Sequence, residues 1–220
     1  MLGFFIRRML ESKDKNRKQM QGDMKKIKAL VIGVILTIFT FLPYIAQADK
    51  YPFDFFKEKV TLSIDKGELN VEGIYYIRNK FSEEEELVIL YPFPIDRYHS
   101  YPHQISINYI DGKNRESVQF IQEEEGVLWP LKIAAGATKC ILIEYNQAFK
   151  DKEATYITTT TQGWGKALEE AKFIVSVPAD FREVKLSYQP DKTEAKNNRV
   201  FYYINKVDFL PVEDLVVKWK

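Results

Sequence analysis

The sequence predicts an all-β protein, an antiparallel β-sandwich of about 10–12 short strands with at most one short helix, near residues 165–172. Three observations predict this fold class. Apolar and polar residues alternate along residues 58–220, turn residues separate the alternating runs, and successive runs are spaced by roughly 8–14 residues. This rhythm is typical of a sandwich, of which the immunoglobulin-like domain is one form, or of a barrel.

Six segments show the alternation that places every second side chain on the core face of a strand. In chain order they are residues 59–65, 104–109, 140–145, 172–178, 183–188 and 214–219. A further segment, Leu87–Tyr91, is apolar throughout. We therefore expect it to be a strand that is covered on both faces.

Residues that tolerate a positive φ predict the turns between these segments. Asp65-Lys66-Gly67 and Asp111-Gly112-Lys113 are typical of hairpins, and Asn197-Asn198 indicates another turn. Gly73 interrupts its strand and predicts a bulge. Residues Gly165–Lys172 hold either a helix of two turns at most or a loop that leads into the next strand.

Residues 24–48 have the features of a secretory signal peptide in the expected order. Three lysines open the segment, an apolar run follows at residues 29–42, and Ala46-Gln47-Ala48 supplies the small side chains that cleavage requires. The pattern predicts cleavage after Ala48. The alternative is a retained membrane anchor, because the apolar run is about long enough to cross a bilayer.

Both interpretations place the rest of the chain outside the cytoplasm, secreted or in the cell envelope. Residues 1–23 are expected to be an upstream leader without structure of its own. Residues 49–220 contain no linker rich in Gly, Pro or Ser and no internal repeat, so we expect a single β-sandwich domain there.

The charge distribution argues against nucleic acid as a partner. Residues 1–48 hold nine of the 32 Lys and Arg residues and three of the 31 Asp and Glu residues, so residues 49–220 have a net charge of −5. A nucleic-acid-binding protein needs a basic surface against phosphate. Cys140 is the single cysteine, which excludes an internal disulfide, and its apolar strand predicts a small buried side chain rather than a nucleophile.

Several short motifs occur in a familiar order. Tyr76-x-x-Asn79 is followed by "LYPFPID" at residues 90–96, "DGK" at 111–113, Trp129, "IAAG" at 133–136 and "ILIEYNQ" at 141–147. This order resembles the vault/inter-alpha-trypsin type of β-sandwich domain over about residues 74–147. The family's Glu-Lys-x-x-Ala helical segment is absent here. The resemblance implies a sandwich with an interaction role, and it implies no catalytic residue.

The stretch Tyr91–His103 contains three prolines, three tyrosines and both histidines of the chain. Two histidines with Asp96 are too few ligands for a predicted zinc site, and no nucleophile motif accompanies them. We therefore predict neither a metal site nor catalytic residues. The stretch is either a stiff connection between strands or, through Tyr98 and Tyr101, a ligand-binding rim, since tyrosines lose little rotamer entropy on binding.

Trp164 is the third candidate ligand-binding residue. It lies between two glycines in "TTTTQGWG", residues 158–165, where the threonines suit a strand and Gln162–Gly165 suits a turn. Such a tryptophan either stacks on a sugar or partner or folds back over the sheet edge. The acidic runs at residues 82–86 and 122–126 are expected to be solvated turns, although calcium binding or a glycosidase pair are alternatives.

The sequence thus predicts an exported, non-catalytic β-sandwich protein with a binding or structural role in the cell envelope. Its expected partner is a protein or an envelope polysaccharide, and it meets the membrane only through an uncleaved N-terminal segment. No cofactor is expected. The alternative is a hydrolase that acts on envelope polymer through two facing carboxylates, which no motif identifies in the sequence.

Overall fold

The computed structural model describes residues 52–220, which form 14 strands and one short 3-10 helix, η1 (Thr159–Trp164). The strands are β1 (Phe53–Asp65), β2 (Glu68–Asn79), β3 (Glu85–Pro92), β4 (His103–Asp111), β5 (Asn114–Ser117), β6 (Ile121–Glu123), β7 (Gly126–Ile133), β8 (Thr138–Ala148), β9 (Glu153–Tyr156), β10 (Leu168–Pro178), β11 (Lys185–Leu186), β12 (Lys192–Lys196), β13 (Arg199–Phe209) and β14 (Leu215–Lys218). The all-β prediction is confirmed, and the strands beyond the expected number are short.

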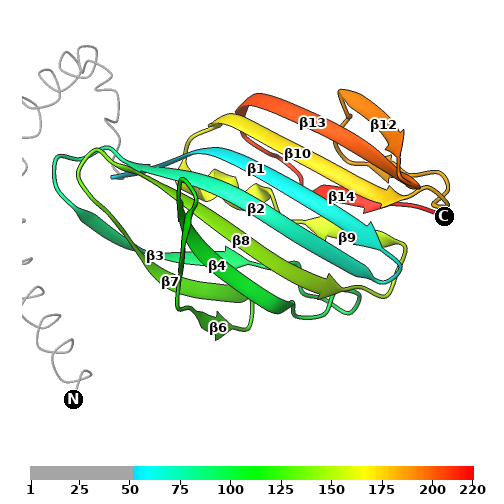
Figure 1. The fold of residues 1–220 in the computed structure, drawn as a ribbon, viewed down its shortest axis with the longest axis horizontal. Coiled ribbons are helices and arrows are strands. Elements are labelled where there is room, and N and C mark those ends of the chain that lie inside the picture. Colours follow the sequence, from blue (N-terminus) through cyan, green and yellow to red (C-terminus); the bar gives the residue numbers. More distant parts are fainter. Residues whose placement is uncertain (1–51) are drawn as a thin grey trace, which may run out of the picture. The chain divides into compact units, whose positions relative to one another are not determined.

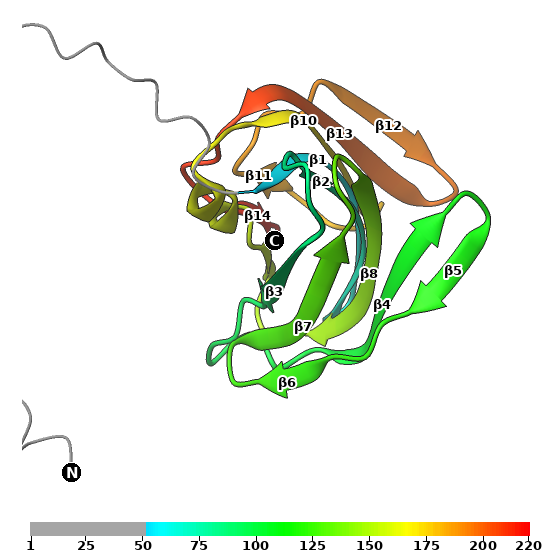
Figure 2. The ribbon, with the colours of Figure 1, turned by 90° about the vertical axis from the view of Figure 1, so that its left-hand side faces the viewer.

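One large sheet and two small sheets form a sandwich-like arrangement. The large sheet has eight strands in the order β12-β13-β10-β1-β2-β8-β4-β5 (Figure 1). The small sheets have three strands each, in the orders β11-β14-β9 and β3-β7-β6. Figure 2 shows the large sheet curving around β3, β7 and β14, so the second layer is divided into two separate sheets. The core lies between the two layers.

Strand pairing is antiparallel in residues 52–220 with one exception. β1 runs parallel to β10, with Val60 beside Phe173. Alternation along β1 buries Val60, Leu62 and Ile64 completely, and Phe173 is buried on β10. Period-two burial therefore places the apolar residues of these central strands on the face that the small sheets cover.

The predicted hairpin turns are confirmed. β1 and β2 are joined through Gly67 at φ 88°, and β4 and β5 through Gly112 at φ 58°. Asn197 and Asn198, at φ 52° and 57°, join β12 to β13. Two successive residues with positive φ give the tight turn that matches the twist of the flanking strands.

The predicted bulge at Gly73 is wrong. The register of β2 runs through Gly73 without a break, and the irregularity lies on β1 between Phe55 and Lys57. Gly73 instead leaves room for a neighbouring ring, because a Cβ atom there would lie 2.1 Å from the hydroxyl oxygen of Tyr75. A glycine in a strand can thus mark a close approach rather than a bulge.

The apolar segment Leu87–Tyr91 is covered on one face only, contrary to expectation. It belongs to β3, which is an edge strand that pairs with β7 alone. Ile89 is buried, whereas Val88 is 65% exposed and Leu90 is 48% exposed. Continuous apolar composition therefore does not prove burial on both faces.

The short helix lies slightly earlier in the chain than predicted. Residues 168–178 form β10, and the threonine-rich stretch forms η1 rather than a strand. Asp214 explains this, because its Oδ1 accepts hydrogen bonds from the backbone N–H of Thr158 and of Thr159, both at 3.0 Å. Gly165, at φ 69°, ends the helix. A tertiary contact has overridden the strand preference of threonine.

The predicted leader at residues 1–23 and the predicted signal peptide at residues 24–48 lie outside the described residues. Within residues 52–220, no helix has the length and apolar character needed to cross a membrane.

Candidate ligand-binding site

The loop between β3 and β4, which holds two predicted contact residues, is fixed by polar side chains. Asp96 Oδ1 accepts hydrogen bonds from the backbone N–H of Tyr98 at 2.7 Å and of His99 at 2.8 Å. The fully buried Gln147 on β8 donates from Nε2 to the carbonyl oxygens of Pro94 and Ser100, both at 2.9 Å. These bonds hold both ends of the loop against the large sheet.

Tyr98 and Tyr101 lie in different surroundings within this loop. Tyr98 is 36% exposed, and the Arg97 guanidinium lies 4.4 Å from the centre of its ring. Tyr101 is half-buried, donates its hydroxyl to the carbonyl oxygen of Gly126 at 2.7 Å, and lies edge-on to Phe93. Tyr101 thus covers the edge of the core, while Tyr98 faces solvent.

The two histidines form separate contacts with acidic residues. His99 Nδ1 lies 3.0 Å from Asp96 Oδ1, and His103 Nε2 lies 3.2 Å from Glu68 Oε1. Within residues 52–220, no group of three or more His, Cys, Asp and Glu side chains is placed to hold a metal ion. Cys140 lies half-buried on β8, and burial raises the pKa of its thiol.

Trp164, the third predicted contact residue, lines a cavity that neither Tyr98 nor Tyr101 reaches. The cavity has a volume of about 130 Å³ and lies above β1, β2 and β8 of the large sheet. β3 forms one side, and the segment from β9 to η1 forms the other. Leu90 and Thr160 line the cavity and are exposed, so they mark its opening to solvent.

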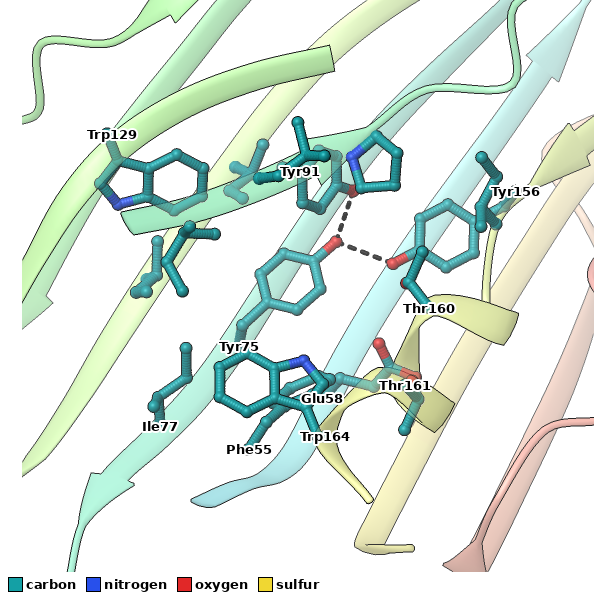
Figure 3. Close-up of a pocket in the computed structure, with 16 residues that line it drawn as sticks. Phe55, Glu58, Tyr75, Ile77, Tyr91, Trp129, Tyr156, Thr160, Thr161 and Trp164 are labelled. Atoms are coloured by element: carbon teal, nitrogen blue, oxygen red, sulfur yellow. Dashed lines mark hydrogen bonds between the residues drawn. The ribbon is translucent and has the colours of Figure 1, made fainter. Parts of the chain in front are cut away.

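Six aromatic side chains line the cavity (Figure 3). They are Phe55, Tyr75, Tyr91, Trp129, Tyr156 and Trp164. The Trp164 ring lies 5.7 Å from that of Phe55, and the Tyr75 ring lies edge-on to Tyr91 at 5.6 Å. A cavity with apolar and aromatic walls and a few polar groups has the composition of a small-molecule site.

Three tyrosine hydroxyls form a chain across the cavity. The Tyr75 hydroxyl lies 2.7 Å from that of Tyr91 and 2.8 Å from that of Tyr156, as the dashed lines in Figure 3 show. Tyr75 comes from the large sheet, whereas Tyr91 and Tyr156 come from the two small sheets. The chain therefore links all three sheets at one point. Burial raises the pKa of each of these hydroxyls well above its ordinary value.

Glu58 is the one carboxylate among the residues that line the cavity. It lies directly across from Tyr75 on the neighbouring strand and is only 3% exposed. Its Oε1 is buried without a hydrogen-bond partner, and within residues 52–220 no ion pair includes Glu58. Burial raises the pKa of this carboxyl group to about 8.

The electrostatic influence of Glu58 reaches the tyrosine hydroxyls. After burial, the Glu58 charge is the next cause that raises the pKa of Tyr75, and it also contributes at Tyr91 and Tyr156. The carboxyl group and the hydroxyl chain therefore belong to one polar cluster within aromatic walls. An isolated buried carboxylate is unfavourable, because the surrounding medium cannot solvate its charge.

The local sequence explains how these groups meet. Glu58 precedes Val60 by two residues, so the alternation of β1 places it on the core face. Gly73 precedes Tyr75 by two residues on the same face of β2, and its missing side chain leaves space for the Tyr75 ring. Both features are local, yet the arrangement that encloses them comes from β3, β9 and η1.

Sequence reasoning identified Trp164 and missed Glu58 and the tyrosine chain. The alternation of Val60, Leu62 and Ile64, continued back by one step, places a glutamate on the core face, and this was the available signal. No comparable signal exists for Tyr75, Tyr91 and Tyr156, because they are far apart in the chain.

Comparison with known proteins gives structural neighbours but no family. No family model matches the chain, and no curated protein matches it. A Legionella pneumophila protein, described as a candidate nutrient-binding protein, superposes with a TM-score of 0.58 and 13% sequence identity. The match covers 77% of this chain and 67% of the Legionella protein.

An M1 zinc metallopeptidase from Deinococcus radiodurans has a TM-score of 0.49 and 12% identity. This match covers 77% of the present chain and 43% of the peptidase, so the chain spans less than half of the peptidase's length. At these identities, the likeness to the Legionella protein supports the fold and nothing beyond it.

Proposed function

We propose that this protein is an exported, non-catalytic binding protein of the cell envelope, and that the cavity beneath η1 is its ligand site. The observation that carries the proposal is the combination of aromatic walls, an opening to solvent and a buried carboxyl oxygen, Glu58 Oε1, that has no hydrogen-bond partner among residues 52–220. Buried polar groups in folded proteins almost always have a partner, so an exception inside a cavity indicates a functional site.

The size of the cavity limits the ligand. A cavity of about 150 Å³ with aliphatic and aromatic walls can hold benzene in another protein. The present cavity, at about 130 Å³, therefore accepts a group of similar size. We infer that it binds either a very small molecule or the end group of a larger one that continues through the opening at Thr160.

Two further observations support a binding role outside the cytoplasm. The Legionella neighbour is described as a candidate nutrient-binding protein, which agrees with a small-ligand site on this fold. The basic start, the apolar run and Ala46-Gln47-Ala48 support export with cleavage after Ala48. Mass spectrometry of the native protein should find Asp49 at the N-terminus, and a terminus at Met1 or Met24 would contradict the cleavage.

The hydrolase alternative remains a hypothesis with less support at this site. General acid–base cleavage of a glycosidic bond uses two carboxyl groups that face one another across the substrate. The residues that line this cavity include one carboxyl group, that of Glu58.

A mutational test of the site uses the cavity opening. Thr160→Trp should block the opening without changing the core, because Thr160 is exposed. Val212→Trp is the matched control, since Val212 is 85% exposed and does not line the cavity. Ligand-observed NMR would screen the purified protein against small amines, quaternary ammonium salts, alcohols, carboxylates and monosaccharides.

We expect at least one of these classes to bind, with binding lost in Thr160→Trp and kept in Val212→Trp. Absence of binding by every class would contradict the proposal, and so would binding that persists in Thr160→Trp. Circular dichroism and thermal melting of both variants would show that the fold is intact.

A further inference from the structure

The charge balance of the cavity indicates what kind of ligand it fits. Glu58 places a carboxyl group, only 3% exposed, inside the cavity wall, and Figure 3 shows it between the large sheet and η1, near Thr161 and Trp164. The cavity lining includes no Lys, Arg or His side chain. Among residues 52–220, the cavity lining thus supplies no positive charge to compensate an ionised Glu58, and a molecule in the cavity could supply one.

The aromatic walls of the cavity, in addition to the Glu58 carboxyl group, favour a cation. The faces of aromatic rings carry partial negative charge and attract organic cations, most strongly within an enclosed site. Phe55, Tyr75, Tyr91, Tyr156 and Trp164 all line the space that Glu58 enters. Aromatic rings around an acidic group are the arrangement that recognises alkylammonium ions.

The tyrosine chain adds acceptors for N–H groups. Its three hydroxyls share two hydrogen bonds, which use two of their protons and leave several oxygen lone pairs free. An ammonium group with N–H donors can bind these oxygens, whereas a quaternary ammonium group would use the ring faces alone. A cavity of about 130 Å³ with polar groups in its wall is large enough for water, which a bound cation would displace.

We propose that the cavity binds a small alkylammonium group, with Glu58 as its counter-ion and the surrounding aromatic rings as its walls. This inference rests on the proposed function and specifies its ligand class. A molecule that carries such a group at one end would leave its remainder at the opening beside Thr160.

The proposal has a consequence for protonation. Because burial raises the pKa of Glu58 to about 8, the free protein at pH 7 holds this group mostly protonated. A bound cation favours the charged form, so binding at pH 7 should release a proton to solvent. The other titratable groups facing Glu58 are the hydroxyls of Tyr75, Tyr91 and Tyr156, which stay protonated over this range.

The test compares cations with neutral molecules of the same shape. Isothermal titration calorimetry would measure binding of choline against 3,3-dimethyl-1-butanol, and of tert-butylammonium against tert-butanol. We expect at least one cation to bind at least tenfold more tightly than its neutral partner. Its affinity should rise between pH 6 and pH 9, and two buffers of different ionisation enthalpy should reveal proton release at pH 7.

Glu58→Gln should reduce the affinity for the cation at least tenfold and abolish its pH dependence, and it should reduce the affinity for the neutral partner far less than that for the cation. Glu72→Gln is the matched control, because Glu72 is exposed on β2 and does not line the cavity. Melting curves of both variants would exclude a folding defect.

The outcomes separate this inference from the proposed function. Equal binding of cation and neutral partner, or undiminished cation binding in Glu58→Gln, overturns the inference and leaves a binding site. If no cation binds but another class in the NMR screen does, the alkylammonium inference fails and the proposed binding function stands. If no class binds, both proposals fail.

Discussion

β1 buries two carboxyl groups that have opposite surroundings. Asp54, 4% exposed, lies 2.5 Å from the Arg78 guanidinium and 3.3 Å from Lys166 Nζ. Glu58 lies four residues later on the same strand and is 3% exposed, and it has no ion pair within residues 52–220. Burial raises the pKa of Glu58, whereas at Asp54 the same effect is outweighed by Arg78 and Lys166, which bring the pKa below its ordinary value.

The comparison separates a structural acid from a candidate binding acid. Arg78 also contacts Glu169 at 3.0 Å and lies over the Phe56 ring, so the Asp54 group ties β1 to β2 and to the start of β10. Glu58 makes no comparable connection. A carboxyl group with protein cations around it connects neighbouring strands and is costly to disrupt, whereas we propose that one without them accepts a cation from outside.

The largest expected effect comes from removing a cation from Asp54. Arg78→Met should destabilise the protein by about 3 kcal/mol, because a buried carboxylate then keeps only the Lys166 contact. Urea denaturation at pH 7 would measure the loss. Arg97→Met is the control, since Arg97 is exposed and contacts Tyr98. Equal midpoints for the two variants would mean that the Asp54 group does not stabilise the fold.

Glu58→Gln should change the free energy of unfolding in the opposite direction to Arg78→Met, and so stabilise the protein at high pH. Between pH 4.5 and pH 8 the folded chain keeps a proton on Glu58 that the unfolded chain has released, so the native protein loses stability as pH rises through this window. Converted at 1.36 kcal/mol per pKa unit, the loss is at most about 5 kcal/mol. We expect the variant to gain about 2–3 kcal/mol of unfolding free energy at pH 9. This gain is smaller than the maximum because the new amide is itself buried without a partner, which costs part of it.

Denaturation curves at pH 4 and pH 9 would check this prediction. Between pH 4 and pH 9 the unfolding free energy of Glu58→Gln should rise relative to that of the native protein by at most about 5 kcal/mol, because the cost of the buried amide is the same at both pH values. A pH-independent difference would show that Glu58 has an ordinary pKa and would erase the contrast with Asp54.

Gly73→Ala should disturb the cavity through Tyr75. The added methyl group would lie 2.1 Å from the Tyr75 hydroxyl, so the ring must move and leave its bonds to Tyr91 and Tyr156. We expect a loss of about 1–2 kcal/mol and weaker ligand binding. Gly163→Ala is the control, because a Cβ atom there meets nothing within 4 Å. Two variants of equal stability would show that the ring can relocate freely.

The smallest effects are expected in the loop between β3 and β4. Tyr101→Phe removes the bond to the Gly126 carbonyl and should cost about 1 kcal/mol, whereas Tyr98→Ala should change stability by less than about 0.5 kcal/mol. If Tyr98 is a partner contact, its variant should also lose retention on native envelope material. A large stability loss in Tyr98→Ala would place this residue with the structural groups.

The sequence predicts more of the fold than of the site, for a physical reason. Alternation and turn residues act locally, so the β1–β2 and β12–β13 hairpins could be predicted from adjacent residues. The cavity depends on contacts between segments far apart, as between Tyr75 and Tyr156. The helical form of Thr159–Trp164 could not be predicted from the local sequence either, because it depends on a hydrogen bond to Asp214 near the end of the chain.

The candidate residues illustrate the same limit. Trp164 could be identified because glycines flank it, but its contact with Phe55 could not be read from that pattern. Glu58 could have been placed on the core face by alternation alone. Whether a cation lies beside it, as at Asp54, depends on which side chains neighbouring strands bring to it.

The parallel pairing of β1 with β10 has a consequence for the order of folding. The first strand described here finds its partner more than a hundred residues later, with Val60 beside Phe173. β1 and β2 can join early as a hairpin, but the other edge of β1 stays open until residues 168–178 are available. Contacts of such high sequence separation form slowly, because a long loop must close first. A chain that stops before Leu168 therefore leaves β1, a central strand of the complete sheet, as an unpaired edge where another copy of the same fragment can bind.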